Sequence, residues 1–235
     1  MLYTENKSGG FSMKSNKNWV YQITHFLVFV YFTLYHRLEI FGKEKIPRDI
    51  PVIVAPNHAS YLDPPVVGYA FYPGYLKFIA WEKLFSFPLF GAFLRKMGAV
   101  PVSQQDKNSS AGLLRLVIGF IKEGYSAFIC PEGHRTEDGT LQPLEGGVAI
   151  MAVKTGAPVI PTYCSGTYRA LAPWMKFPRP CKLTVTFGDP IDPAKAPEEL
   201  SEREKRRWVL EQIEAFYKQE DARDKEKYPL APRKD

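Results

Sequence analysis

From residue 37 onward, short apolar runs that are typical of β-strands alternate with segments of helical period. Strands that alternate with helices form a largely parallel sheet with helices on both faces. The sequence therefore predicts an α/β fold, built as a single domain with a largely parallel mixed sheet flanked by helices. Ligand sites of such sheets lie in the loops beyond the carboxyl ends of the strands. The expected strands are residues 37–41, 52–55, 77–80, 99–103, 126–130, 159–164 and 183–187, and the expected helices between them are 64–71, 83–96, 109–124 and 147–155.

The chain of 235 residues is long enough for one large domain with a real core. Residues 1–36 are expected to form an N-terminal membrane-associated helical segment, and residues 37–219 the main domain. Ser201 and Glu204 predict a capping box at the start of a last helix. Residues 220–235 are rich in charge, and we predict that this tail is disordered.

The membrane assignment depends on residues 18–35, which contain no charged side chain. A bilayer span needs about 20 mostly apolar residues, so this stretch is at the short limit. Polar residues within it weaken a spanning interpretation further. We expect a helix that lies in the membrane interface, and a buried core helix is the alternative. Basic residues flank the stretch at Lys14, Lys17 and Arg37.

The net charge of +6 suits an anionic membrane surface, a phosphorylated substrate or nucleic acid. Nucleic acid is not expected as a partner, because the aromatic residues cluster with aliphatic ones and do not interleave with basic residues. Cys130, Cys164 and Cys181 are too few and too scattered for a disulfide framework or a zinc site. A reducing compartment follows, and we expect the protein at the cytoplasmic face of the membrane, peripheral or monotopic.

His58 and Asp63 stand between the strand expected at 52–55 and the helix expected at 64–71. If the loop curls, the carboxylate can accept a hydrogen bond from one ring nitrogen of His58, and the other nitrogen is then a general base. The pair resembles the histidine and the aspartate of a serine-hydrolase triad, but no protein nucleophile accompanies it. The hydroxyl of a substrate would therefore attack. Alternatively, Asp63 is only the N-cap of the helix and His58 only a loop residue. On spacing alone both interpretations stay open.

A second polar run, residues 131–136, follows the strand expected at 126–130. Gly133 permits a tight turn, and Arg135 can bind a phosphate or a carboxylate in a bidentate manner. A helix cap or a surface ion pair explains Glu132 and Arg135 equally well. A third run, residues 159–161, is uninformative by itself.

Several other classes of site are absent from the sequence. The chain has no G-x-S-x-G nucleophile elbow and no glycine-rich nucleotide fingerprint. The remaining histidines stand at no ligand spacing, so neither a metal nor a cofactor is expected.

Taken in order, three sequence blocks resemble motifs I, III and IV of the glycerolipid acyltransferase family, typified by 1-acylglycerol-3-phosphate acyltransferase. The blocks are NHASYLDP, PEGHRT and PVIP, and residues 84–102 resemble the segment that leads to motif II. The resemblance implies that His58 is the base, that Asp63 orients it, and that the donor is acyl-CoA or acyl carrier protein, without a metal. The acceptor it implies is a lysolipid, most simply 1-acylglycerol 3-phosphate, which would give phosphatidic acid. The positions it assigns to substrate binding are Gln104, Glu132, Gly133, His134, Arg135 and Pro161.

Three positions depart from the family pattern. Gln104 stands where the family usually has an arginine, Glu145 where it often has a basic residue, and His134 where threonine is more usual. The first two changes remove positive charge that would face an acceptor phosphate. A lysolipid without a terminal phosphate is therefore an alternative acceptor. A non-catalytic lipid-binding protein at the membrane is a further alternative, but such a protein would not need both His58 and Asp63.

Overall fold

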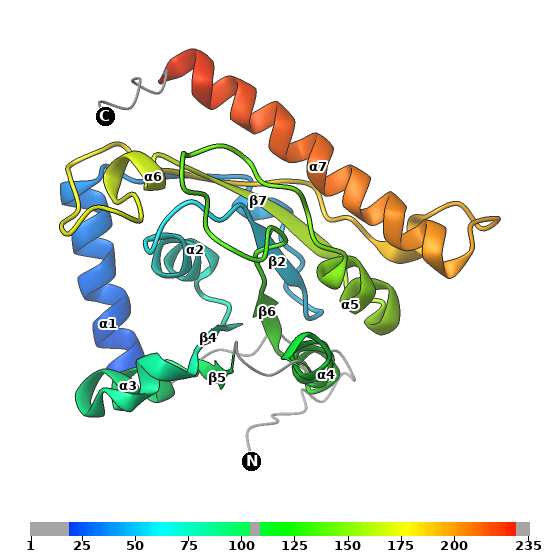
Figure 1. The fold of residues 1–235 in the computed structure, drawn as a ribbon, viewed down its shortest axis with the longest axis horizontal. Coiled ribbons are helices and arrows are strands. Elements are labelled where there is room, and N and C mark those ends of the chain that lie inside the picture. Colours follow the sequence, from blue (N-terminus) through cyan, green and yellow to red (C-terminus); the bar gives the residue numbers. More distant parts are fainter. Residues whose placement is uncertain (1–18, 104–108, 229–235) are drawn as a thin grey trace.

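The computed structural model describes residues 19–103 and 109–228, and it places a six-stranded sheet at the centre of the molecule (Figure 1). The strand order is β1-β8-β7-β2-β6-β3. All neighbouring strands are parallel except β7 and β8, so the predicted largely parallel mixed sheet is confirmed. The strands are β1 Glu39–Phe41, β2 Ile53–Pro56, β3 Leu76–Lys77, β6 Ser126–Phe128, β7 Val159–Ser165 and β8 Thr184–Phe187.

Helices cover both faces of this sheet, as predicted. On one face, α2 packs Val66, Val67 and Phe71 against alternate residues of β2, β7 and β8. The opposite residues of β2 and β7 pack against α4, α5 and α7 in a second core. The helices are α1 Trp19–Val30, α2 Asp63–Phe71, α3 Pro88–Lys96, α4 Ser109–Lys122, α5 Gly147–Thr155, α6 Thr167–Ala170 and α7 Glu202–Lys227.

The strand predicted at 77–80 is two strands that belong to different sheets. β3 joins the main sheet, whereas β4 (Ile79–Trp81) pairs in parallel with β5 (Val100–Val102) in a separate two-stranded sheet. The helix predicted at 83–96 is also divided, into a 3-10 turn (Glu82–Ser86) and α3. Phe87 is extended between them because a residue before proline avoids the helical region, and Pro88 then starts α3.

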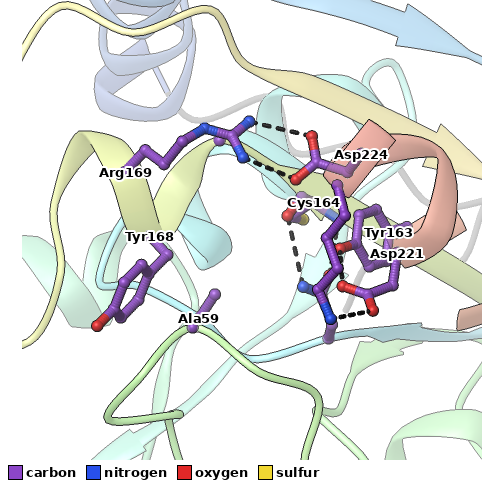
Figure 2. Close-up of a pocket in the computed structure, with 11 residues that line it drawn as sticks. Ala59, Tyr163, Cys164, Tyr168, Arg169, Asp221 and Asp224 are labelled. Atoms are coloured by element: carbon purple, nitrogen blue, oxygen red, sulfur yellow. Dashed lines mark hydrogen bonds and ion pairs between the residues drawn. The ribbon is translucent and has the colours of Figure 1, made fainter. Parts of the chain in front are cut away.

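The last helix begins as predicted and ends later than predicted. Ser201 and Glu204 form the expected capping box, with the Ser201 N–H donating to Glu204 Oε2 at 2.8 Å. The helix then continues to Lys227, so the prediction of disorder from residue 220 is wrong as far as this point. Its last turns are fixed because Asp221 accepts from Tyr163 at 3.0 Å and Asp224 forms a bidentate ion pair with Arg169 (Figure 2). Residues 229–235 lie outside the described residues.

The expected N-terminal helix is present as α1, which runs into a π-helical turn at Tyr31–Tyr35. One side of α1 packs on α2. The centroid of the His25 ring lies 4.9 Å from that of Tyr69 and 4.1 Å from that of Tyr72. The other side exposes large apolar residues, so α1 is not a buried core helix. Within residues 19–103 and 109–228, no helix combines the length and the apolar character needed to cross a membrane.

Candidate active site

The loop that carries His58 starts at the carboxyl end of β2 and is anchored there by Asn57. The Asn57 side chain accepts from the Cys164 N–H at 2.7 Å and donates to the Cys164 carbonyl at 3.4 Å. The backbone N–H of Asn57 donates to the Thr162 carbonyl at 3.3 Å. These three bonds fix the direction in which the chain leaves the sheet toward His58.

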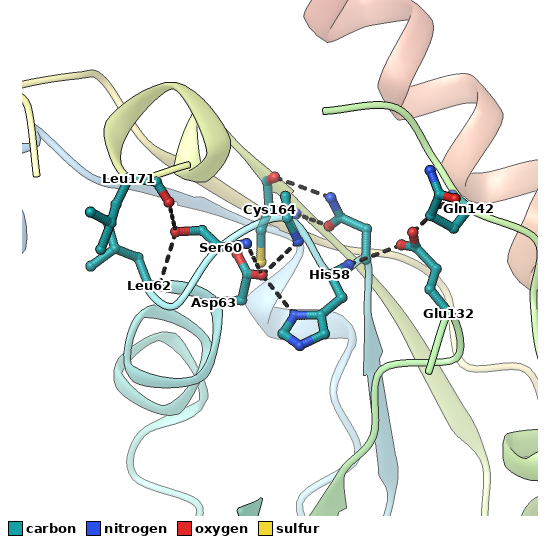
Figure 3. A network of polar contacts seen from close by, with 10 residues as sticks. His58, Ser60, Leu62, Asp63, Glu132, Gln142, Cys164 and Leu171 are labelled. Atoms are coloured by element: carbon teal, nitrogen blue, oxygen red, sulfur yellow. Dashed lines mark hydrogen bonds and ion pairs between the residues drawn. The ribbon is translucent and has the colours of Figure 1, made fainter. Parts of the chain in front are cut away.

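Asp63 holds this loop in a tight curl (Figure 3). A single oxygen of its fully buried carboxylate, Oδ2, accepts from His58 Nδ1 at 3.1 Å and from the N–H groups of Ala59 and Ser60 at 2.7 Å each. Asp63 is the first residue of α2, and the N-cap position is Leu62, which makes no side-chain cap. The alternative in which Asp63 only caps the helix is therefore wrong, because its carboxylate turns back into the loop.

This geometry fixes the tautomer of His58. An ionised carboxylate only accepts, so Nδ1 carries the proton and the lone pair lies on Nε2. His58 Nε2 makes no hydrogen bond with any residue that the structure describes, and the side chain is 17% exposed. The ring is thus an oriented base whose free nitrogen faces outward.

Nothing in the described part of the chain supplies a nucleophile to this base. The Ser60 hydroxyl donates to the Leu171 carbonyl at 2.7 Å instead of to His58. Burial, reinforced by the nearby Asp63 carboxylate, raises the pKa of the Cys130 and Cys164 thiols well above the usual value. Because the thiolate is the reactive form, both cysteines are inert at neutral pH.

The loop after β6 clamps the backbone of His58 from the other side. Glu132 accepts from the His58 N–H at 2.9 Å and, through its second oxygen, from the Gln142 N–H at 2.8 Å. The Thr136 N–H donates to the His58 carbonyl at 2.9 Å. Burial raises the pKa of the Glu132 carboxyl, although the hydrogen bonds from the His58 and Gln142 amides act in the opposite direction.

Two residues assigned to substrate binding by the resemblance are not placed to bind a substrate. Glu132 is buried, and both of its oxygens are occupied by backbone amides, so it positions His58 instead. Pro161 lies inside β7, buried opposite Ala55, with its carbonyl accepting from the Gly188 N–H. Gln104 lies outside the described residues.

Gly133 shows why this loop needs a glycine. Its φ is +73°, a conformation that residues with a side chain rarely adopt. A Cβ at this position would also displace the exposed Glu145 carboxylate, which lies against the turn. The predicted tight turn is confirmed, and Glu145 lies beside it.

His134 and Arg135 lie on the open side of the loop, where they line a cavity of about 400 Å³ with Glu137, Asp138 and Gln142. The guanidinium carbon of Arg135 lies 3.8 Å from the centroid of the Tyr61 ring. Asp138 is held by neighbouring threonines, and hydrogen bonds from Thr140 first, then Thr136, lower its pKa to about 2.

The described residues contain no cluster of three or more histidine, cysteine, aspartate or glutamate side chains that could hold a metal ion. Sequence reasoning missed the residues that hold the loops, because each acts through contacts distant in sequence. No spacing signal marks them, although three of the five stand inside the block NHASYLDP and one directly follows Arg135. These residues are Asn57, Ser60, Tyr61, Thr136 and Gln142.

Comparison with known proteins identifies similar chains. The family described as "Acyltransferase" matches residues 37–165. A chloroplastic 1-acyl-sn-glycerol-3-phosphate acyltransferase of Brassica napus is 34% identical over 134 residues, which are 57% of this chain and 38% of that protein. A 1-acyl-sn-glycerol-3-phosphate acyltransferase of Bacillus subtilis is 26% identical over 157 residues, 67% of this chain and 75% of that protein.

A solved structure is similar in fold. The crystal structure of the 1-acyl-sn-glycerophosphate acyltransferase PlsC from Thermotoga maritima has a TM-score of 0.68 and 28% identity, over 85% of this chain and 79% of that chain. The present chain spans less than two fifths of the length of the first two chloroplastic relatives that it matches.

Proposed function

Because this chain belongs to the acyltransferase family, we propose that it transfers a fatty-acyl chain from a thioester donor to the free hydroxyl of a lysolipid. The proposed acceptor is 1-acylglycerol 3-phosphate, and the product is phosphatidic acid. The observation that carries the proposal is the His58–Asp63 pair, with Nδ1 bound to the carboxylate at 3.1 Å and Nε2 free of any described partner. The names of the similar proteins support the choice of acceptor.

In the proposed reaction, His58 Nε2 takes the proton of the acceptor hydroxyl as that oxygen attacks the thioester carbonyl carbon. The carbon–sulfur bond then breaks, and the imidazolium returns its proton to the leaving thiolate. Asp63 stabilises the imidazolium between these steps, and the buried environment of its carboxylate strengthens that interaction. Acyl-CoA and acyl carrier protein present the same thioester, and either is consistent with this chemistry.

Arg135 is the residue proposed to bind the acceptor phosphate, because a phosphate monoester carries close to two negative charges near neutral pH. The acidic residues near it, Glu137 and Asp138, favour the second candidate, an acceptor without a terminal phosphate.

The experiment that separates them is an acyl-transfer assay in detergent. Acyl-CoA and acyl carrier protein donors would each be tested against lysophosphatidic acid and lysophosphatidylcholine, for the wild type and Gln104→Arg. Restored positive charge in Gln104→Arg should raise kcat/KM for lysophosphatidic acid if that is the acceptor. A wild type that prefers lysophosphatidylcholine would overturn the acceptor and leave the acyl transfer intact.

We further propose that the protein docks on an anionic membrane surface, at the cytoplasmic face, through one apolar side. The support is that α1, α3 and the loop at 171–180 lie on the same side of the molecule (Figure 1). Each of these segments has exposed apolar residues. Lys96 of α3 lies over the ring of Trp19 at the start of α1, and Tyr35, in the π-helical turn that follows α1, donates to the Pro178 carbonyl. The exposed residues are Trp19, Ile23, Phe26, Leu27, Phe29, Leu34, Phe87, Leu89, Phe90, Trp174 and Phe177.

Vesicle flotation tests the docking side. Leu89 is 90% exposed and Phe177 80% exposed, so Leu89→Glu with Phe177→Glu should weaken flotation without unfolding the protein. The matched control is Gln212→Glu with Gln219→Glu, which adds the same charge at exposed positions of α7. Equal flotation of both double variants would refute the proposed docking side.

A further inference from the structure

We infer that Tyr61 is a positioning residue that holds the Arg135 guanidinium ready for the phosphate monoester of the acceptor. This inference rests on the proposed function. It adds a residue that the family resemblance does not assign, and it names what selects a phosphate monoester over a zwitterionic headgroup.

The geometry is a cation–π stack between two loops. The guanidinium carbon of Arg135 lies 3.8 Å from the Tyr61 ring centroid, well within the range of this interaction. Tyr61 is 56% exposed, so its ring does not fill the core. Its hydroxyl makes no hydrogen bond with a described residue, and the ring face is therefore the part of this side chain that interacts.

The charge of Arg135 is left unneutralised by this arrangement. Among the described residues, no carboxylate forms an ion pair with the guanidinium, and its Nε atom is buried without a hydrogen-bond partner. A carboxylate partner would occupy the N–H donors and oppose an anionic ligand. An aromatic face holds the plane of the guanidinium, whereas the N–H donors of its two terminal nitrogens lie at the edge and stay available for phosphate oxygens.

The stack also links the phosphate to the base. Tyr61 stands three residues after His58 in the loop that Asp63 curls, and Arg135 directly precedes Thr136, whose N–H binds the His58 carbonyl. Both partners of the stack are thus attached to the segments that fix His58. A phosphate bound at Arg135 is held at a set place relative to the imidazole, and so is the hydroxyl of the same molecule.

The test compares two substitutions of Tyr61 that differ in the aromatic face. Tyr61→Leu removes the face and keeps an apolar side chain, and Tyr61→Phe keeps the face. Tyr61→Leu should raise the KM for lysophosphatidic acid roughly 3- to 30-fold, the range that a cation–π contact supports, with a smaller change in kcat. Tyr61→Phe should restore a KM within about twofold of the wild type, because the ring face is what acts. The KM for lysophosphatidylcholine should not change in either variant.

A double-mutant cycle shows whether Tyr61 acts through Arg135. In the Arg135→Ala protein, Tyr61→Leu should have little further effect on lysophosphatidic acid. The same variants are also compared for binding of lysophosphatidic acid and lysophosphatidylcholine in detergent micelles, a readout that needs no turnover. Weaker binding of lysophosphatidic acid by Tyr61→Leu supports the inference even if no acyl transfer occurs, which would refute only the proposed function. Equal binding and KM for Tyr61→Leu and Tyr61→Phe, in an active enzyme, would overturn the inference and leave the function standing.

Discussion

Asp63 and Glu132, the two buried carboxylates of the site, hold different parts of the same residue. Asp63 accepts from the ring of His58, and Glu132 accepts from its backbone N–H. The first contact sets the protonation and the angle of the imidazole, whereas the second sets the place of the loop. Substitutions of the two carboxylates should therefore have different effects.

His58→Ala should fold normally and lose about 10²–10⁴-fold in kcat, because general base catalysis contributes this much. Asp63→Asn should also lose activity, since an amide can favour the wrong tautomer of the imidazole. Asp189→Asn is the control, because Asp189 is an exposed partner of Lys45. Steady-state kinetics, with circular dichroism to verify folding, would measure these effects. Near-normal turnover in a well-folded His58→Ala protein would contradict the proposed mechanism.

Glu132→Gln should lower kcat more than it raises KM. The glutamine carbonyl can accept from one of the two amides, and its NH₂ group then faces the other, so the His58 loop loses a hydrogen bond to a charged acceptor. Such a bond is worth about 1.5–3 kcal/mol, and roughly a tenfold loss in rate is expected. Glu199→Gln, at an exposed position, should leave the rate unchanged. A variant that changes KM alone would show that Glu132 contacts the acceptor after all.

Acyl transfer should proceed without a covalent acyl-enzyme. Burial raises the pKa of the Cys130 and Cys164 thiols, and no described hydroxyl or thiol bonds to His58. Replacement of all three cysteines by alanine or serine should keep kcat within about tenfold of the wild type, because the remaining effect is one of packing. Rapid-quench mass spectrometry with a labelled donor is the direct measurement. Label on any side chain at the rate of turnover would refute direct transfer.

Asp224→Asn should destabilise the protein although it is distant from His58 in sequence. The substitution removes the negative charge of a carboxylate that forms a bidentate ion pair with Arg169. The same carboxylate accepts a hydrogen bond from the Ser165 hydroxyl at the end of β7. The loss should be about 1.5–3 kcal/mol, as for hydrogen bonds to a charged group. Glu211→Gln, which breaks an exposed pair with Arg207 on the same helix, should cost less than about 0.5 kcal/mol. Urea unfolding would compare the stability of the two variants. Equal unfolding midpoints would show that the contacts of Asp224 do not stabilise the protein more than an exposed ion pair does.

Stability should fall as the pH is lowered below about 6.5, in part through His36. This side chain is fully buried between the Tyr31 hydroxyl and the Cys181 carbonyl, and burial lowers its pKa from the usual 6.5. The unfolded chain then binds more protons than the folded one, so stability rises with pH in this window and is lost as pH falls through the lowered pKa. His36→Gln should reduce this slope. It should not abolish it, because burial also lowers the pKa of His25.

The sequence allowed much of the fold to be predicted because local signals coincide with the elements. Gly156, with φ +70°, ends α5 where expected, and the capping box at Ser201 starts α7. The division between β3 and β4 could not be predicted, because Phe78 interrupts neither the apolar pattern nor the strand propensity around it. The extension of α7 depends on contacts with Arg169 and Tyr163. The composition of residues 220–235 cannot reveal these contacts, because both partners lie in other elements of the fold.

For the site, the catalytic pair could be predicted from the sequence, whereas the residues that hold its loop in place could not. His58 and Asp63 are five residues apart, so one loop brings them together. Glu132 was expected at the acceptor because the family resemblance assigns its position to substrate binding. Its burial follows from two backbone amides that come together only in the folded chain. Pro161 belonged to a block of the family pattern, and only the sheet shows that this block is a buried strand.

The ion pair between Arg169 and Asp224 also has a consequence for synthesis of the chain. Translation runs from the N-terminus, so α1 leaves the ribosome before the strands of the sheet, and Asp224 leaves after all of them. Cys164, near the end of β7, anchors Asn57 and the loop of His58. Until α7 has emerged, this end of β7 lacks the contacts that Asp224 makes with Ser165 and Arg169. If the protein docks on a membrane as proposed, the exposed apolar side of α1 is therefore synthesised before the contacts that hold the end of β7 are complete.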